Sequence, residues 1–347
     1  MHGSYGPPLV SARGGFLTAR DRGIIPGVNE QDEFPRQQRD RHRRVPRLEQ
    51  AVGRVATLIL VPSAVAVPLG PTWAVLSGVV AAGHWRWQGS TLLSLIAVVF
   101  VAEILWSSWR AQLVDVGWKQ WAHTHPLPTR GAPMPTLPYT KPDSPLGRSL
   151  AYIGRVRLWI REVLPDERRG ALIATFALPP LILLLSVLVS MHMLTLSVAA
   201  LSVVILEWRA AAREENHDAL RAALEIGLSW LAGHLVVAPL TPVSLILACC
   251  YATAYQGILS VERLHGPGAP AVARPFAFLL SGQLVAGLVV LLAGREAPHL
   301  GAVVLGFLII PQLLLLTGAS LPDHSHVYAR RVAPFLMLAM PIAAWAA

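Results

Sequence analysis

The chain has few charged residues for its length and almost no cysteine. Asp, Glu, Lys and Arg make up 14% of its 347 residues, whereas 54% are hydrophobic. This composition excludes a large water-soluble domain and is typical of a membrane protein. The two cysteines, Cys249 and Cys250, are adjacent inside an apolar run, so we expect no structural disulfide. Nucleotide-binding loops, nucleophile elbows and zinc-binding helix motifs are also missing, and we assign no metal ligands.

Acidic residues are fewer than basic ones. The chain has 20 Asp and Glu against 29 Lys and Arg, a formal net charge of +9. The basic residues lie in alternate joints between apolar runs, which is the pattern that orients helices in a membrane. We therefore expect membrane lipids as partners and no nucleic acid.

Apolar runs fill most of the chain. Seven runs of about bilayer length or slightly shorter follow residue 170, at 171–190, 194–206, 222–238, 243–260, 275–293, 300–317 and 332–347. Three more precede it, at 51–69, 72–83 and 91–107. Because backbone polar groups inside a bilayer must be satisfied within each segment, the pattern predicts an all-α, polytopic helix bundle over residues 49–347.

Residues 1–48 form a polar segment that contains a cluster of arginines. Six arginines lie between positions 36 and 47, just before the first apolar run. The segment is long and rich in Pro, Gly and Gln, unlike a secretory signal, so we expect a disordered cytoplasmic arm. Two interpretations are equally compatible with it: contact with anionic headgroups, or a solvated linker without a partner.

The distribution of arginine predicts the topology. If the arm is cytoplasmic, the arginine-rich joints 108–170, 208–221, 261–274 and 318–331 should lie on the same side. This requires an even number of crossings before residue 108. The run 72–83 is too short for a straight crossing, so we interpret it as a re-entrant or interfacial piece. Nine crossings of the cell (inner or plasma) membrane follow, or ten if 72–83 also crosses.

The joint 108–170 is predicted to be a long cytoplasmic loop that contains a helix. Ser144 followed by Pro145 is a typical helix start. Apolar residues then recur every three or four positions up to about residue 164, with arginines between them. We therefore expect an amphipathic helix over 144–164 that lies on the membrane surface.

Five polar residues lie inside or at the ends of the apolar runs. Such residues usually mark a pathway or a buried pair. Glu103 and Glu225 are near predicted helix ends, where snorkelling to water explains them. His234 is deeper and is a candidate for a ligand or interhelical contact. Gln283 and Gln312 complete the set.

Three strings resemble the UbiA superfamily of intramembrane prenyltransferases. "HPLPTRG" from His125 is similar to the Arg-Pro-Leu-Pro-Ser-Gly string after that family's first aspartate motif. "HDALRAALEIGLSWLAGHLVV" is similar to the joint that runs into its Leu-Gly-Leu-x-Trp-Gly helix. "YATAYQGILSVERLHG" resembles the second motif, with Tyr251 and Tyr255 at its two tyrosine positions. The resemblance covers residues 45–347 and implies a nine-helix, UbiA-like fold around an apolar cavity.

The chain departs from the family at the aspartates. Members hold Mg²⁺ on an isoprenoid diphosphate with two aspartate clusters. Here Asp115 is the only acid near the first motif, Ala252 and Leu259 replace aspartates of the second, and Glu262 is the only carboxylate nearby. Magnesium-dependent ionisation is therefore not expected by the usual means, and Mg²⁺ is implied only if catalysis survives.

The resemblance leaves three hypotheses. The first is a scaffold without normal catalysis that binds a quinone, pigment or isoprenoid, or packs as a subunit of a membrane complex. The second is an active divergent prenyltransferase that uses Asp115 and Glu262. The third is a transporter or permease. The residues expected to bind a ligand or its phosphate are Arg110, Lys119, Arg209, Arg213, Tyr251, Tyr255 and Arg263.

Overall fold

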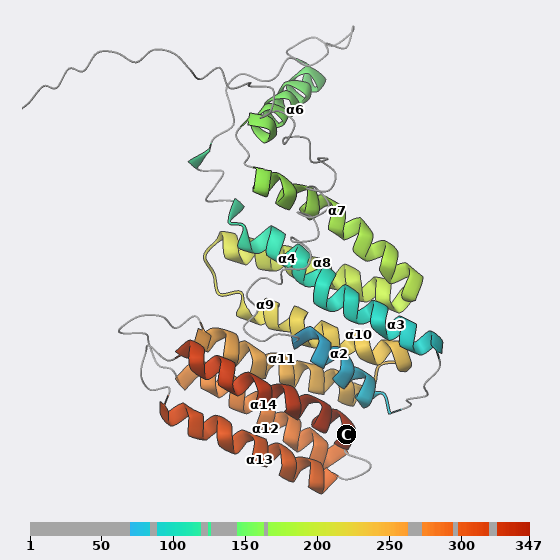
Figure 1. Cartoon of the computed structure of the whole chain (residues 1–347), viewed down its shortest axis with the longest axis vertical. Coiled ribbons are helices and arrows are strands. Elements are labelled where there is room, and N and C mark those ends of the chain that lie inside the picture. Colours follow the sequence, from blue (N-terminus) through green and yellow to red (C-terminus); the bar gives the residue numbers. More distant parts are fainter. Residues whose placement is uncertain are drawn as a thin grey trace, which may run out of the picture. The chain divides into compact units, whose positions relative to one another are not determined.

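The computed structural model describes residues 70–83, 89–118, 124–125, 144–162, 166–262, 273–293, 298–318 and 325–347. Its main helices are α2 (Gly70–Ala81), α3 (Gly89–Val99), η2 (Phe100–Trp106), α4 (Ser107–Arg110), η3 (Ala111–Asp115), α6 (Pro145–Glu162), α7 (Asp166–Val189), α8 (Met191–Ala212), α9 (Asp218–Ala222), η4 (Ala223–Leu228), α10 (Ser229–Val237), α11 (Pro242–Glu262), α12 (Ala273–Ala293), α13 (Pro298–Gly318) and α14 (Ser325–Ala346). The all-α prediction is confirmed for these residues, which contain no strand (Figure 1).

Seven helices in the described part of the chain are long and apolar enough to cross a membrane. They are Gly89–Asp115, Arg168–Val189, Met191–Ala212, Asp218–Val237, Pro242–Val261, Pro275–Ala293 and Pro298–Leu315. The outer faces of α7, α12 and α13 expose large apolar side chains such as Phe176, Leu292 and Phe307. Exposed apolar surface of this extent belongs against lipid, so the chain is a multi-pass membrane protein.

Two of the nine predicted crossings are not among these seven helices. The run 51–69 and the predicted arm, residues 1–48, lie outside the described residues. The run 332–347 forms most of α14, which packs against α13, α11 and α2 but carries Arg330 and Arg331 near its start. The count of nine therefore stays a prediction.

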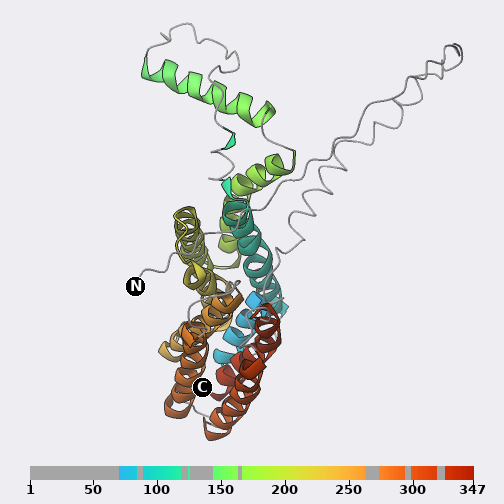
Figure 2. The same ribbon diagram turned by 90° about the vertical axis from the view of Figure 1, so that its left-hand side faces the viewer.

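Helix α2, formed by the short run at 72–83, is buried between α10 and α14 (Figures 1 and 2). It begins beside Ile226 and ends beside His234, so it runs parallel to η4 and α10. Most of its residues are buried. The interfacial interpretation is therefore wrong, because α2 lies within the bundle, whereas the re-entrant interpretation stays a prediction.

The crossing of α2 and α10 depends on two glycines. A Cβ atom added to Gly78 would lie 2.0 Å from the carbonyl oxygen of Trp230, and one added to Gly233 would lie 1.9 Å from that of Val75. Small residues allow helix backbones in a membrane to approach this closely. The backbone nitrogen of His234 lies at the same crossing and its side chain is buried, so of the two alternatives for this residue the structure supports an interhelical contact.

A buried pair of amides joins α12 to α13. Gln283 Nε2 donates to Gln312 Oε1 at 2.7 Å, and Gln312 Nε2 donates back to Gln283 Oε1 at 2.9 Å. Each amide thereby satisfies the other inside two apolar helices. Of the two expectations for these residues, the structure supports a buried pair.

The polar joints are shorter than the sequence predicted. The helix that begins at Gly89 continues to Asp115, so the joint expected at 108–170 loses its first eight residues to a membrane helix. The joint expected at 208–221 shrinks to residues 213–217 between α8 and α9. Both predicted joints were too long, because charged residues such as Arg110 and Glu207 lie within helices, where they pair across the helix interface.

The predicted amphipathic helix is present as α6. The Ser144 hydroxyl accepts a hydrogen bond from the backbone N–H of Gly147 at 3.0 Å, which confirms the predicted cap. The apolar side chains of Leu146 and Ile153 are exposed. Its placement on the membrane surface stays a prediction.

Polar contacts bring several arginine-rich joints to one side of the bundle. Arg110 lies five residues before the end of its helix and contacts Glu207, which lies five residues before the end of α8. Glu225, seven residues after the start of α9, contacts Tyr255 near the end of α11. The joints after η3, α8 and α11 therefore share a side, as predicted, and the assignment of that side to the cytoplasm stays a prediction.

Substitution of either crossing glycine by alanine should destabilise the bundle. We expect Gly233→Ala and Gly78→Ala to cost at least about 1–3 kcal/mol of unfolding free energy, because the added methyl group meets backbone that cannot move aside. Gly287→Ala and Gly306→Ala are matched controls, since a Cβ at either position meets nothing within 4 Å. Denaturant unfolding in detergent, followed by circular dichroism, measures the difference, and equal losses in all four variants would contradict the prediction.

Candidate functional site

A cluster of charged side chains, most of them buried, lies on the side of the bundle that the arginine-rich joints share. We call it the arginine cluster. It consists of Arg110, Asp115, Glu207, Arg221 and Glu225. Its members come from α4, η3, α8, α9 and η4, so it ties together three membrane helices that are separate in the sequence.

Arg110 is the centre of the cluster. Its side chain is 3% exposed, and its guanidinium lies 3.0 Å from Asp115 Oδ2, 3.1 Å from Glu207 Oε1 and 3.7 Å from Glu225 Oε1. Glu207 is fully buried and Glu225 is 3% exposed, whereas Asp115 is 46% exposed. A buried guanidinium needs such partners, because taking an unpaired charge out of water costs several kcal/mol. The planar group with its five N–H donors suits three carboxylates arranged around it.

The second half of the cluster is centred on Glu225. Arg221 Nε donates to Glu225 Oε1 at 2.8 Å, across one turn of the same helix. The hydroxyl of Tyr255, from α11, donates to Glu225 Oε2 at 2.7 Å. Both oxygens of this carboxylate are therefore occupied, and it links α9 and η4 to α11.

Stretches of π-helix place two of the carboxylates. The hydrogen bonds of a π-helix run between residues five apart, so its wider turn brings residue i+5 close to residue i. The η3 stretch begins directly after Arg110 and ends at Asp115, which brings that carboxylate back over the guanidinium. The η4 stretch likewise contains Glu225. Single π-helical turns occur often at functional sites.

The predicted catalytic residues have different positions. Asp115 is bound to Arg110 with both carboxylate oxygens, at 3.4 and 3.0 Å. Glu262 is the last residue of α11, and the structure does not describe its side chain. Among the described residues, no group of three or more His, Cys, Asp or Glu side chains is arranged to hold a metal ion. The carboxylates of the cluster surround a guanidinium instead.

The predicted ligand-binding residues do not converge on one place. Arg110 and Tyr255 meet at the arginine cluster. Tyr251 lies one turn deeper on α11, where its hydroxyl donates to the carbonyl of Ala339 at 2.9 Å. Arg209 and Arg213 are exposed at the end of α8, away from the buried cluster. Lys119 and Arg263 lie outside the described residues.

Sequence reasoning missed Glu207 and Arg221 and misjudged Glu225. Glu225 does not snorkel to water, because Arg221 and Tyr255 bind it inside the bundle. The sequence does contain a clue: charged residues lie near those ends of three crossings that were predicted to be on the same side of the membrane. Oppositely charged residues at the same depth in neighbouring membrane helices tend to pair.

Glu103 also has a structural partner in place of water. It lies near the middle of the Gly89–Asp115 helix. Its Oε2 accepts hydrogen bonds from the backbone N–H of Thr72 at 2.9 Å and from the Thr72 hydroxyl at 3.1 Å. The carboxylate thus caps the first turn of α2, where helix N–H groups lack partners and the helix dipole favours negative charge.

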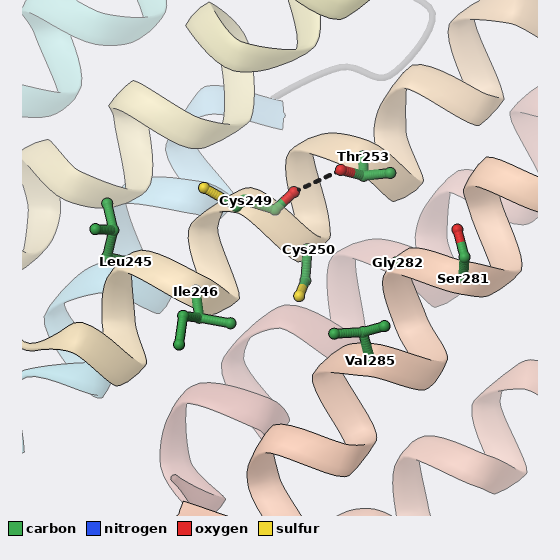
Figure 3. Close-up of a pocket in the computed structure, with 8 residues that line it drawn as sticks. All are labelled: Leu245, Ile246, Cys249, Cys250, Thr253, Ser281, Gly282 and Val285. Carbon is green, nitrogen blue, oxygen red and sulfur yellow. Dashed lines mark hydrogen bonds between the residues drawn. The ribbon is translucent and has the colours of Figure 1, made fainter.

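A groove lies between α11 and α12, and several of its apolar lining residues are exposed. Its volume is about 340 Å³, and its lining is almost entirely apolar. Figure 3 shows the side chains of Cys250 and Val285 projecting into the space between the two helices. The complete lining is Leu245, Ile246, Cys249, Cys250, Thr253, Ser281, Gly282 and Val285.

Comparison with known proteins identifies no relative. No protein-family model matches the chain, no curated protein matches it, and no solved structure matches it.

Removal of the central guanidinium should strongly destabilise the fold. We expect Arg110→Met to cost about 3–5 kcal/mol, because the fully buried Glu207 would lose the guanidinium bonded to it and Glu225 would keep only Arg221 as a counter-charge. Arg213→Met is the matched control, since its ion pair with Glu215 is exposed and should contribute about 0–1 kcal/mol. Unfolding in detergent measures both variants. Equal stability of the two would show that the cluster does not hold the helices together.

Proposed function

We propose that this membrane protein is a UbiA-like scaffold that holds a lipophilic molecule, such as a quinone, pigment or isoprenoid, or packs as a subunit of a membrane complex. It does so without magnesium-dependent prenyl transfer. The observation that carries this proposal is the position of Arg110, whose guanidinium lies between carboxylates near the place where the resemblance puts the first aspartate motif.

The chemistry of the cluster supports the loss of magnesium-dependent catalysis. Mg²⁺ in phosphate-binding sites needs free carboxylate oxygens to bridge it to the diphosphate. Both oxygens of Asp115 are engaged by Arg110, and both oxygens of Glu225 are engaged by Arg221 and Tyr255. A metal ion would have to displace a buried guanidinium from the same oxygens.

The groove between α11 and α12 supports the binding of an apolar molecule. Its lining residues Leu245, Ile246 and Val285 are partly exposed toward the lipid side, so a chain enters sideways from the bilayer. A volume of about 340 Å³ suits a segment of an isoprenoid or acyl tail. In this proposal the arginine cluster fixes the helices, and the groove receives the tail.

The proposed location is the cell (inner or plasma) membrane, with the arginine-rich joints in the cytoplasm. The arginine cluster then lies on the cytoplasmic side. Glu207 is five residues, or about 8 Å along the helix, from the end of α8.

Transport is a second candidate, because α2 is a short helix that begins inside the bundle. Its first turn meets a carboxylate, Glu103, within a membrane helix. Discontinuous helices whose N-termini meet charged groups near the middle of the bilayer are characteristic of many secondary transporters.

Blocking the groove should remove the bound molecule. The protein is purified in mild detergent, and the lipophilic molecules and polypeptides that stay bound are identified by mass spectrometry and absorbance. We expect a stoichiometric apolar molecule or a stable complex in the wild type, and its loss in Ser281→Trp, whose ring would fill the groove. Leu284→Trp is the matched control, because it is exposed on the same helix outside the lining.

Three further outcomes would change this proposal. Prenyl-diphosphate turnover that requires Mg²⁺ and collapses in Asp115→Ala would establish the active transferase and refute the scaffold. A wild type that carries neither ligand nor partner, together with solute uptake into proteoliposomes, would favour transport. Equal ligand content in Ser281→Trp and Leu284→Trp would place the ligand somewhere other than the groove.

A further inference from the structure

We propose that Glu207 and His217 form a proton-binding site, which exchanges protons with water on the side of the arginine-rich joints and controls the packing of α8 against α4 and η4. This inference does not depend on the proposed function. It rests on the formal charges of the arginine cluster, the burial of Glu207 and the position of the His217 ring.

The formal charges of the arginine cluster do not balance. Arg110 and Arg221 contribute two positive charges, whereas Asp115, Glu207 and Glu225 contribute three negative charges. One bound proton makes the cluster neutral. An ionised Glu207 without a full counter-charge is costly, because its fully buried carboxylate is poorly solvated by the surrounding protein.

Glu207 is the carboxylate best placed to take that proton. Its side chain is fully buried, and its Oε2 has no hydrogen-bond partner within the part of the chain that the structure describes. Asp115, by contrast, is 46% exposed and remains hydrated. Glu225 already accepts hydrogen bonds on both oxygens. A buried oxygen without a donor is stabilised when the carboxyl group becomes protonated.

His217 provides the connection to water. It lies in the short joint between α8 and α9 and is 17% exposed, and its Nε2 is 3.9 Å from Glu207 Oε1. Its Nδ1 is 3.2 Å from the carbonyl oxygen of Glu215, which only accepts, so Nδ1 carries a hydrogen. In the neutral ring Nε2 is then the unprotonated nitrogen, and it faces Glu207. The ring of His217 and the carboxylate of Glu207 therefore lie next to each other, and His217 is the partly exposed one of the two.

In the part of the chain that the structure describes, Arg110 is the guanidinium that bonds Glu207 directly, and Arg221 acts on it from farther away. Arg110 from α4 and Asp115 from η3 face Glu207 on one side, and Arg221 and Glu225 approach from α9 and η4. Asp218, also on α9, binds Ser260 of α11 and adds further negative charge. Tyr255 of α11 donates a neutral hydroxyl. Helix α7 also packs against α8, and the Ser186 and Ser197 hydroxyls form a hydrogen bond between the two helices.

Proton occupancy then controls the helix packing. With the proton bound, the cluster is neutral and α8 stays against α4 and η4. When the proton leaves to water, Glu207 and Glu225 share Arg110 under net negative charge, and the interface loosens. Because the folded state binds this proton and the unfolded state releases it, stability should be present at low pH and fall as the pH rises through the titration.

The test is a pH titration of the full-length protein in detergent. Infrared spectroscopy detects the carbonyl stretch of a protonated carboxylic acid, and potentiometry counts the protons taken up. We expect the wild type to take up about one proton more than Glu207→Gln over this titration, and the carbonyl band to be lost in that variant. His217→Gln should shift the pH at which this proton is taken up. Glu214→Gln and His192→Gln are exposed controls and should behave as the wild type.

Stability supplies the second measurement. The thermal midpoint of the wild type should fall as the pH rises, and that of Glu207→Gln should change much less, because this variant keeps two positive and two negative charges. An unchanged carbonyl band in Glu207→Gln, or the same pH dependence of stability in both proteins, would overturn the proposal. If the thermal midpoint responds to sodium at constant pH and does not respond to pH, the bound ion is not a proton and the proposal is overturned. If Glu207→Gln does not fold, absence of the band in the wild type still refutes the site.

Discussion

The buried guanidinium of Arg110 is the constraint on which the rest of the structure depends. A charge at this depth is tolerated only with counter-charges from neighbouring helices, and those counter-charges come from η3, α8 and η4. The helices are thereby fixed in register at one end of the bundle. The hydrophobic effect cannot hold helices together in a bilayer, since acyl chains solvate apolar side chains as well as other helices do. Packing elsewhere relies on glycine contacts and the Gln283–Gln312 amide pair.

The same arrangement gives the carboxylates a role that differs from metal binding. In a magnesium site, carboxylates stay available because the metal and its phosphate ligand arrive together. Here Arg110 and Arg221 are permanent parts of the helices, so the carboxylates are engaged before any ligand binds. What remains for the cluster is to hold helices together and to respond to small changes in charge, and the gain or loss of a single proton is such a change.

The sequence predicted most of the helices but little of the candidate site. Long apolar runs identify membrane helices because the backbone has no alternative in lipid, and the Ser144 cap identifies α6. The helix ends were misplaced because charges such as Arg110 and Glu207 look like loop residues until their partners are known. Pairing across helices depends on the relative rotation and depth of the helices, which a single sequence does not encode locally. For the same reason, the burial of α2 and its cap at Glu103 were not foreseen.

The crossing of α2 and α10 has a consequence for biosynthesis. The two helices touch backbone to backbone at Gly78 and Gly233, although most of the chain's membrane helices are encoded between or after them. During translation α2 leaves the ribosome long before α10 exists. With twelve residues it is shorter than a straight crossing needs, and its contact with α10 can form only after α10 has been made. The contact between α2 and α10 therefore forms out of sequence order, after the membrane helices encoded between them have been translated.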